Sequence, residues 1–207
     1  MNDLSDSLLS YINGLGLELS EDKRSLLLRY LDLLFKWNKA YNLTAIKDRQ
    51  TMLVRHIVES LALIPYIYGR EIADIGTGAG LPGIPLAIAF PDRHFTLVDS
   101  NGKKTRFLNQ VKLELSLKNI TVMNNRIETL RCESPFDQIL SRAFADIATT
   151  LELLDHVWPP SACLSLMKGP GVAAELSEVG VPISHKIIEL NIPSQKEYRC
   201  IVEIKRN

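Results

Sequence analysis

The sequence contains few cysteines and no excess of charge of either sign. Its 207 residues include three cysteines, Cys132, Cys163 and Cys200, whose wide spacing fits neither a disulfide framework nor a zinc site. We therefore expect reduced thiols and no bound metal. Lysine and arginine number 24, as do aspartate and glutamate, so the formal net charge is zero. This balance excludes a uniformly basic nucleic-acid-binding protein but allows a locally basic face.

Long apolar runs and a secretory leader are also lacking. The most apolar stretch, residues 81–90, is interrupted by Pro82, Gly83 and Pro85, so it cannot form a helix that spans a bilayer. Residues 1–4 have neither the basic lead nor the apolar run of a secretory signal. A content of 46% hydrophobic and 23% charged residues is typical of globular proteins. We therefore expect a soluble cytoplasmic protein that does not bind membranes.

Residues 1–68 are predicted to form a helical amino-terminal region. Ser20 is placed to cap a helix that runs to about Trp37. A shorter helix is expected before it, and a third over about 52–64, where Pro65 stops it. Apolar residues at helical spacing identify the buried faces of the first two helices. We expect these faces to contain Leu8, Leu9, Ile12, Leu27, Tyr30, Leu31 and Leu34.

Residues 69–207 alternate short apolar strands with helices. This alternation predicts an α/β fold with a doubly wound, mostly parallel sheet, which binds ligands at the carboxyl ends of its strands. The last two predicted strands are separated by only eight residues, so we expect them to be antiparallel. A helix is expected over 104–115. The predicted strands are 71–75, 94–98, 120–123, 136–140, 162–167, 186–190 and 199–204.

A glycine-rich turn over residues 74–83, DIGTGAGLPG, is the most specific motif in the chain. Gly76, Gly78 and Gly80 allow a ligand to lie directly against the backbone, and the helix that follows offers free N–H groups. Asp99 ends the next strand, where its carboxylate can accept hydrogen bonds from both hydroxyls of a ribose. Together these features predict a ligand that contains adenosine.

Two other functions remain open at this point. Residues 78–83 fit the G-x-G-x-x-G pattern of dinucleotide-binding enzymes, so the protein could be a nicotinamide-dependent reductase. The acidic Asp74 disfavours that reading, because a carboxylate near a pyrophosphate is unfavourable, whereas a sulfonium cation tolerates it. The second alternative is a module that binds an adenosine ligand and RNA without catalysing a reaction.

The turn also resembles a known family. Residues 74–80 resemble the first motif of class I S-adenosylmethionine-dependent methyltransferases, and residues 74–85 resemble the RsmG family, also called glucose-inhibited division protein B. Residues 36–44, 53–57 and 141–144 are similar to further segments of that family, although Glu59 stands where the family has Asp. The resemblance implies a Rossmann-like class I methyltransferase fold, S-adenosyl-L-methionine as the cofactor, and methylation of N7 of a guanine in the 530 loop of bacterial 16S rRNA. It also implies 16S rRNA or the small ribosomal subunit as the partner.

The resemblance further implies roles for individual residues. It places Gly76 and Leu81 at the cofactor, Ile127 and Glu128 beside the adenine, and Arg142 at the cofactor or the target base. Arg142 is also the best candidate for a catalytic contribution. Guanine N7 carries a lone pair and no proton, so its methylation needs positioning and no general base. The expected cofactor-binding residues are Gly76, Gly78, Gly80, Leu81, Asp99, Ile127, Glu128 and Arg142.

Two locally basic segments predict a face that contacts RNA. Residues 23–49 contain seven Lys or Arg and two Asp, and residues 101–126 contain six Lys or Arg and one Glu. The alternative is that these charges only solvate helix faces. We expect His56 to be a hydrogen-bonded buried histidine, Trp37 to serve in packing and the protein to be a monomer. The candidate RNA-binding residues are Lys36, Lys39, Arg55, Lys103, Lys104, Arg106, Lys168 and Arg199.

Overall fold

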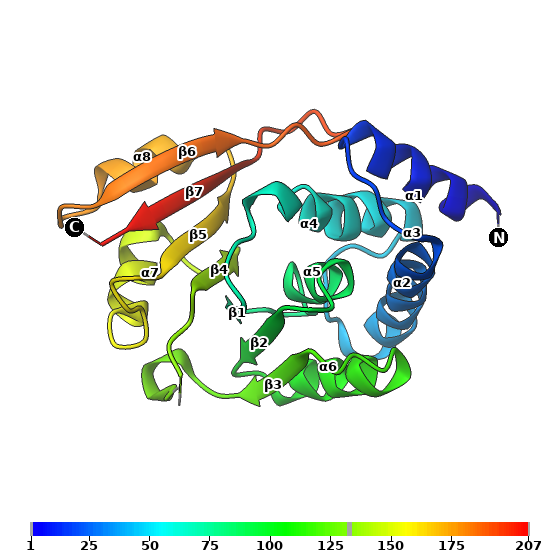
Figure 1. The fold of residues 1–207 in the computed structure, drawn as a ribbon, viewed down its shortest axis with the longest axis horizontal. Coiled ribbons are helices and arrows are strands. Elements are labelled where there is room, and N and C mark those ends of the chain that lie inside the picture. Colours follow the sequence, from blue (N-terminus) through cyan, green and yellow to red (C-terminus); the bar gives the residue numbers. More distant parts are fainter. Residues whose placement is uncertain (1, 132–133, 207) are drawn as a thin grey trace.

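The computed structural model describes residues 2–131 and 134–206, and a seven-stranded sheet forms its centre. The strand order is β3-β2-β1-β4-β5-β7-β6. Helices cover both faces of the sheet, with α7 and α8 on one side and α4, α5 and α6 on the other (Figure 1). The strands are β1 (Glu71–Ile75), β2 (His94–Asp99), β3 (Ile120–Asn124), β4 (Gln138–Arg142), β5 (Cys163–Lys168), β6 (Ser184–Glu189) and β7 (Cys200–Lys205).

The sheet pairing confirms the predicted α/β topology. The five strands β1 to β5 are mutually parallel where they pair, and β7 runs antiparallel to both β5 and β6. The helices are α1 (Asn2–Gly14), α2 (Glu21–Tyr41), α3 (Arg49–Met52), the π-helix η1 (Leu53–Val58), α4 (Glu59–Leu61), the 3₁₀ helix η2 (Ile64–Tyr66), α5 (Gly83–Ala89), α6 (Gly102–Glu114), the 3₁₀ helix η3 (Ile127–Thr129), α7 (Ile147–Leu154) and α8 (Val172–Ser177).

The fourth strand begins two residues later than the sequence pattern suggests. Asp137 lies before β4, and its carboxylate accepts hydrogen bonds from the backbone N–H groups of Arg70 and Glu71 at 2.6 and 3.0 Å. These bonds keep the pKa of Asp137 below its usual range. Phe136 is buried, so it reads as a strand residue although it belongs to the connecting loop.

The amino-terminal helices bury the predicted stripes with one exception. Ser20 caps α2 by accepting a hydrogen bond from the Lys23 N–H at 3.4 Å. In α1, Leu8 and Ile12 are buried, whereas Leu9 is 40% exposed. The expectation for Leu9 was wrong because a residue one position from Leu8 lies about 100° around the helix, away from the face that residues i and i+4 share. The other predicted positions, Leu27, Tyr30, Leu31 and Leu34, are all buried.

The third predicted helix is longer at its start and internally irregular. It begins at Arg49, where the Asp48 carboxylate accepts a hydrogen bond from the Thr51 N–H at 2.7 Å. It then passes through the π-helical η1 into α4. Single π-helical turns inside α-helices are frequent at functional sites. The helix ends at Leu61, and Pro65 lies in the following 3₁₀ turn.

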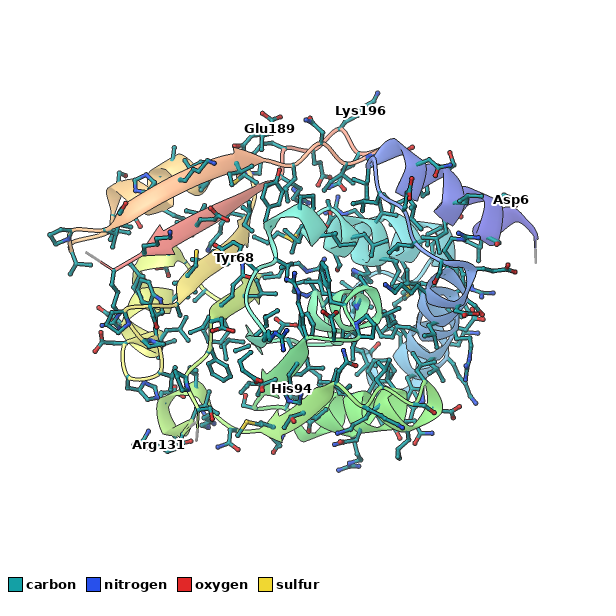
Figure 2. The ribbon with its side chains drawn as sticks, viewed as in Figure 1. Asp6, Tyr68, His94, Arg131, Glu189 and Lys196 are labelled. Atoms are coloured by element: carbon teal, nitrogen blue, oxygen red, sulfur yellow. The ribbon has the colours of Figure 1, made fainter. Side chains whose placement is uncertain are left out.

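The helical region and the sheet share one hydrophobic core. Leu27 and Ile57 belong to the same buried cluster as Leu97 of β2 and Phe107 of α6. Tyr68, labelled in Figure 2, lies at the predicted boundary between residues 1–68 and 69–207, and its hydroxyl donates to Glu203 of β7 at 3.2 Å. The division of the chain at residue 68 stays a prediction.

The carboxyl-terminal hairpin extends from the sheet to the first helix. The loop between β6 and β7, which carries the labelled Lys196 in Figure 2, reaches the end of α1. There Pro193 approaches Gly14 so closely that a β-carbon added to Gly14 would lie 2.9 Å from the proline ring.

Cys163 and Cys200 are buried free thiols, and Cys132 lies outside the described residues. Within residues 2–131 and 134–206, the helices are too short or too polar to cross a membrane.

Candidate active site

The glycine-rich turn is folded around the buried carboxylate of Asp74. One of its oxygens, Oδ2, accepts hydrogen bonds from the Thr77 hydroxyl at 2.6 Å and the Gly83 N–H at 2.8 Å. The other, Oδ1, is buried without a hydrogen-bond partner among the described residues. Burial raises the pKa of Asp74 to about 6. The carboxylate therefore shapes the turn between β1 and α5 instead of facing a ligand directly.

Three glycines of the turn, Gly76, Gly78 and Gly80, have positive φ angles but different surroundings. A β-carbon on Gly80 would meet Ile84 and Leu108 at 2.5 and 2.8 Å, so packing against α5 and α6 requires this glycine. A β-carbon on Gly76 would meet the Phe144 ring at 2.5 Å. The space in front of Gly78 is open, since the nearest atoms lie 3.9 Å away.

This arrangement changes the reading of two predicted cofactor residues. Leu81 is only 5% exposed and belongs to the hydrophobic core. Its N–H donates to the carbonyl oxygen of Thr77, which closes the turn. Gly80 and Leu81 are thus packed inside the turn. Neither they nor Gly78 lines the cavity described next, and the contact of all three residues with the cofactor stays a prediction.

A cavity of about 440 Å³ opens at the carboxyl ends of β1 and β2. We call it the Asp99 cavity. The Asp99 carboxylate accepts hydrogen bonds from the Gly78 N–H at 2.9 Å and the Asn101 N–H at 2.8 Å, one on each oxygen, so each oxygen retains a lone pair. The cavity brings together four of the predicted cofactor residues, one predicted RNA-binding residue, and Phe144 of the segment 141–144. Its lining includes Gly76, Asp99, Lys104, Ile127, Glu128 and Phe144.

A second cavity, of about 590 Å³, lies beside the end of β4. We call it the Arg142 cavity. It shares Ala143, Phe144 and Ala145 with the Asp99 cavity, so this short segment separates the two spaces. Arg142 lines this second cavity and not the Asp99 cavity. Residues far apart in the sequence meet here, namely Arg55, His56, Glu59, Arg142, Lys168 and Arg199.

Glu59 is the buried centre of the Arg142 cavity. It is 4% exposed and accepts a hydrogen bond from the Gln195 side chain at 2.7 Å. Its carboxylate also pairs with Arg55 at 3.2 Å, Arg142 at 3.2 Å and Arg199 at 3.4 Å. A buried carboxylate is stable only when it is paired in this way. Sequence reasoning missed this role, although the spacing of Arg55 and Glu59 by four residues on a helix is a signal for their pair.

His56 links Arg142 to the loop that follows α2. Its Nδ1 lies 3.3 Å from Arg142 Nη2, and its Nε2 lies 2.8 Å from the Thr44 hydroxyl. Because a guanidinium can only donate, Nδ1 accepts and the ring proton resides on Nε2. Burial, together with the charge of Arg142, lowers the pKa of His56 to about 4. His56 is thus the hydrogen-bonded buried histidine that we expected.

The three further segments that resemble the family, besides the glycine-rich turn, converge at this point. Asn38 holds Thr44 in place, since its side-chain oxygen accepts a hydrogen bond from the Thr44 N–H at 2.8 Å. Thr44 contacts His56, and His56 contacts Arg142. Residues 36–44, 53–57 and 141–144 thereby form one hydrogen-bonded chain that ends at the cavity.

Comparison with known proteins identifies the family. The profile of the family described as rRNA small subunit methyltransferase G matches residues 23–202. The chain belongs to the rRNA small subunit methyltransferase G family. Ribosomal RNA small subunit methyltransferase G of Pectobacterium carotovorum is 43% identical over 206 residues, which cover 99% of this chain and 100% of that one. The protein of the same name from Salmonella typhimurium is 44% identical over 193 residues, 93% of each chain.

The fold is that of class I methyltransferases. The solved structure of magnesium protoporphyrin IX methyltransferase from Synechocystis PCC 6803, with bound S-adenosylmethionine, has a TM-score of 0.58. The two chains are 18% identical, and the match covers 91% of this chain and 99% of that one. Membership of the methyltransferase G family confirms the predicted enzyme class, a methyltransferase, and its cofactor, S-adenosyl-L-methionine.

The predicted RNA-binding residues of this methyltransferase G chain fall into three groups. Arg55, Lys168 and Arg199 lie in the Arg142 cavity, where acidic partners neutralise much of their charge. Lys168, for example, donates to the Ala145 carbonyl oxygen and to Glu175 at 2.6 and 2.7 Å, and so braces the segment between the cavities. Lys104 lies in the Asp99 cavity, 3.5 Å from the Asp99 carboxylate. The remaining candidates, Lys36, Lys39, Lys103 and Arg106, are exposed on α2 and α6.

Several basic side chains of residues 23–49 in the methyltransferase form bonds within the protein. Lys23, Arg24 and Arg29 donate to backbone carbonyl oxygens, and Arg49 pairs with Asp32. Trp37 packs between Tyr41 and Phe107, with ring centroids 5.2 and 5.6 Å away, as expected. The contact of the exposed basic residues with RNA stays a prediction.

Proposed function

We propose that this methyltransferase transfers a methyl group from S-adenosylmethionine to N7 of a guanine in the 530 loop of 16S rRNA. The observation that carries the proposal is the pair of adjoining cavities. The Asp99 cavity has a carboxylate with unused lone pairs, and the Arg142 cavity contains three arginines and a lysine. Residues 143–145 separate the two cavities. Family membership supports rRNA of the small subunit as the substrate.

We assign the cofactor to the Asp99 cavity. The two unused lone pairs of Asp99 can accept the hydroxyls of the ribose, and the open space in front of Gly78 leaves room for the methionine end. Ile127 and Glu128 line the cavity and are assigned to the adenine. These residues therefore fit an adenosine ligand with an extended substituent. We keep Gly80 and Leu81 as residues that hold the shape of the turn.

The chemistry needs orientation more than acid–base groups. S-adenosylmethionine supplies an electrophilic methyl group when it is bound. The N7 lone pair forms the new bond to carbon as the carbon–sulfur bond breaks, and no proton leaves the base. The protein must hold the two reacting atoms about 3–3.5 Å apart in line. The 143–145 segment between the cavities, braced by Lys168, is the part of the chain placed to define this separation.

The experiment that tests this proposal maps the methylated base. The purified protein is incubated with labelled S-adenosylmethionine and small ribosomal subunits, or free 16S rRNA, from a strain that lacks the gene. We expect label in one guanosine of the 530 loop. Treatment with borohydride and aniline should then cleave the RNA chain at that position, which identifies the nucleotide as 7-methylguanosine. Label at another position or on another atom contradicts the assignment. Binding of cofactor and RNA without transfer supports a non-catalytic module, and oxidation of a reduced nicotinamide by the enzyme supports a reductase.

We further propose that the enzyme acts as a cytoplasmic monomer. The two cavities already hold the groups that the proposed reaction needs, namely a carboxylate for the ribose and an arginine for the base. Light scattering during size-exclusion chromatography tests the monomer, for which we expect a mass near 23.3 kDa. A dimer that persists at low protein concentration contradicts it.

A further inference from the structure

The Arg142 guanidinium has donors that the protein does not use. Of its five N–H groups, Nη1 donates to the Arg55 carbonyl oxygen at 2.9 Å and to Glu59 at 3.2 Å, and Nη2 donates once to His56 at 3.3 Å. The Nε–H and the second Nη2–H have no partner within residues 2–131 and 134–206. The side chain remains 18% exposed and lines the Arg142 cavity. An arginine anchored by three bonds therefore offers two fixed donors to whatever enters this cavity.

The anchoring bonds come from groups that can only accept at Arg142. The backbone carbonyl oxygen of Arg55 and the carboxylate of Glu59 hold Nη1. His56 Nδ1 accepts from Nη2 because Thr44 takes the proton on Nε2. If His56 did not accept, the planar guanidinium would be held only through Nη1. It could then rotate as a unit, and the direction of the two remaining donors would be lost.

We propose that Arg142 selects guanine by donating to O6 of the target base, and that His56 is a positioning residue that keeps the two remaining donors of Arg142 directed into the cavity. The proposal rests on the proposed function. Guanine presents N7 and O6 as neighbouring acceptors on one edge, and arginine is the common partner of that edge. Since N7 must keep its lone pair free for the methyl group, O6 is the acceptor left for Arg142.

The same contact explains why adenine would be rejected. Adenine carries an amino group at position 6, so its N–H would face the N–H groups of Arg142 and both would lose their partners. A site built to hydrogen-bond a particular group discriminates strongly against an analogue that lacks it. The carboxylate of Glu59, 3.2 Å from Nη1, also offsets the guanidinium charge beside a base that becomes positively charged on methylation.

The test uses semisynthetic 16S rRNA with one of three bases at the methylated position. These bases are guanine, hypoxanthine, which keeps O6 but lacks the 2-amino group, and 2,6-diaminopurine, which keeps the 2-amino group but has an amino group in place of O6. In single-turnover reactions of the full-length wild-type enzyme, we expect hypoxanthine to react within about tenfold of guanine. We expect 2,6-diaminopurine to react on the order of 100-fold more slowly. The ratio of the guanine rate to the diaminopurine rate is the readout.

The variants separate positioning from folding. Arg142→Ala is expected to bring the ratio to within about threefold of one, by slowing only the guanine reaction. His56→Asn places an acceptor oxygen where Nδ1 stands and should retain the ratio, whereas His56→Leu should lose it. Should His56→Leu fail to fold, Thr44→Val releases the ring from its fixed orientation and should lower the ratio in the same direction. Thermal unfolding and S-adenosylhomocysteine affinity confirm that each variant is intact.

The outcomes distinguish this inference from the proposed function. If the wild type does not methylate guanine in this RNA, the proposed function fails. If it methylates guanine and diaminopurine equally well, or hypoxanthine as slowly as diaminopurine, then O6 is not read and the inference is overturned while the proposed function stands. A full ratio in folded His56→Leu would show that His56 has only a structural role.

Discussion

Replacement of Glu59 by glutamine tests whether this buried carboxylate holds the Arg142 cavity together. The Gln side chain has nearly the same shape, but its amide N–H₂ would face the N–H groups of an arginine and the negative charge would be lost. Three arginines within 3.2–3.4 Å of Glu59, one of them Arg142, would then lack their common counter-charge. Removing one partner of a buried ion pair costs about 3–5 kcal/mol.

Glu197 provides a matched control for this change. It pairs with two of the same arginines, Arg55 at 2.5 Å and Arg199 at 2.8 Å, but its side chain is 59% exposed. Exposed ion pairs contribute little to stability. In urea unfolding we expect Glu59→Gln to lose about 3 kcal/mol and Glu197→Gln to stay close to the wild type. For a protein of this size, 3 kcal/mol corresponds to about 6–12 °C in Tm. Equal losses in the two variants would refute the central role of Glu59.

Three further changes test the turn, the ribose carboxylate and the histidine. Gly80→Ala should destabilise the fold by about 2 kcal/mol or more in urea unfolding, because its β-carbon meets Ile84 and Leu108. Gly78→Ala should mainly weaken the binding of S-adenosylhomocysteine in calorimetry. A larger loss of stability in Gly78→Ala, with a larger loss of binding in Gly80→Ala, would contradict this. Asp99→Ala should weaken the binding of S-adenosylhomocysteine about 10- to 150-fold, because charge-assisted hydrogen bonds to the ribose are lost. An unchanged affinity in calorimetry would contradict the assignment of Asp99 to the ribose. The lowered pKa of His56, about 4, means that the unfolded chain gains a proton between pH 6.5 and 4 that the folded chain does not, so this residue removes up to about 3 kcal/mol of stability as pH falls through that range. Protonation of buried Asp74, whose pKa is raised to about 6, acts in the opposite direction. The effect of the histidine is therefore measured as the difference in stability between the wild type and His56→Asn, by urea unfolding at pH 7 and 4.5. An identical pH dependence of the two proteins would contradict the prediction.

The sequence predicted those features that depend on neighbouring residues in the chain. The strand at 71–75 and the cap at Ser20 follow from short local patterns, and both are confirmed. The motif also predicted that the glycine-rich turn and Asp99 lie together, and Gly76 and Asp99 line the same cavity. The resemblance of short segments was sufficient for the family and the cofactor.

The features that the sequence did not predict depend on contacts across the fold. The spacing of Arg55 and Glu59 reveals one pair, but the role of Glu59 also requires Arg142 and Arg199, which are more than 80 residues away in the chain. Gly80 looks the same as Gly78 in the motif, but its α-carbon faces α6 instead of the open space. The approach of Lys104 to Asp99 is also a contact that a run of basic residues does not reveal, and the contact of Lys104 with RNA stays a prediction.

The division of the site into a cofactor cavity and a base cavity is tested most directly by a crystal structure with S-adenosylhomocysteine. We expect the two ribose hydroxyls within hydrogen-bond distance of Asp99, the adenine beside Ile127, and the sulfur atom facing the segment 143–145 that borders the Arg142 cavity. The Arg142 side chain should keep its bonds to His56 and Glu59. A cofactor whose carboxylate binds Arg142, or that occupies the Arg142 cavity itself, would contradict this account.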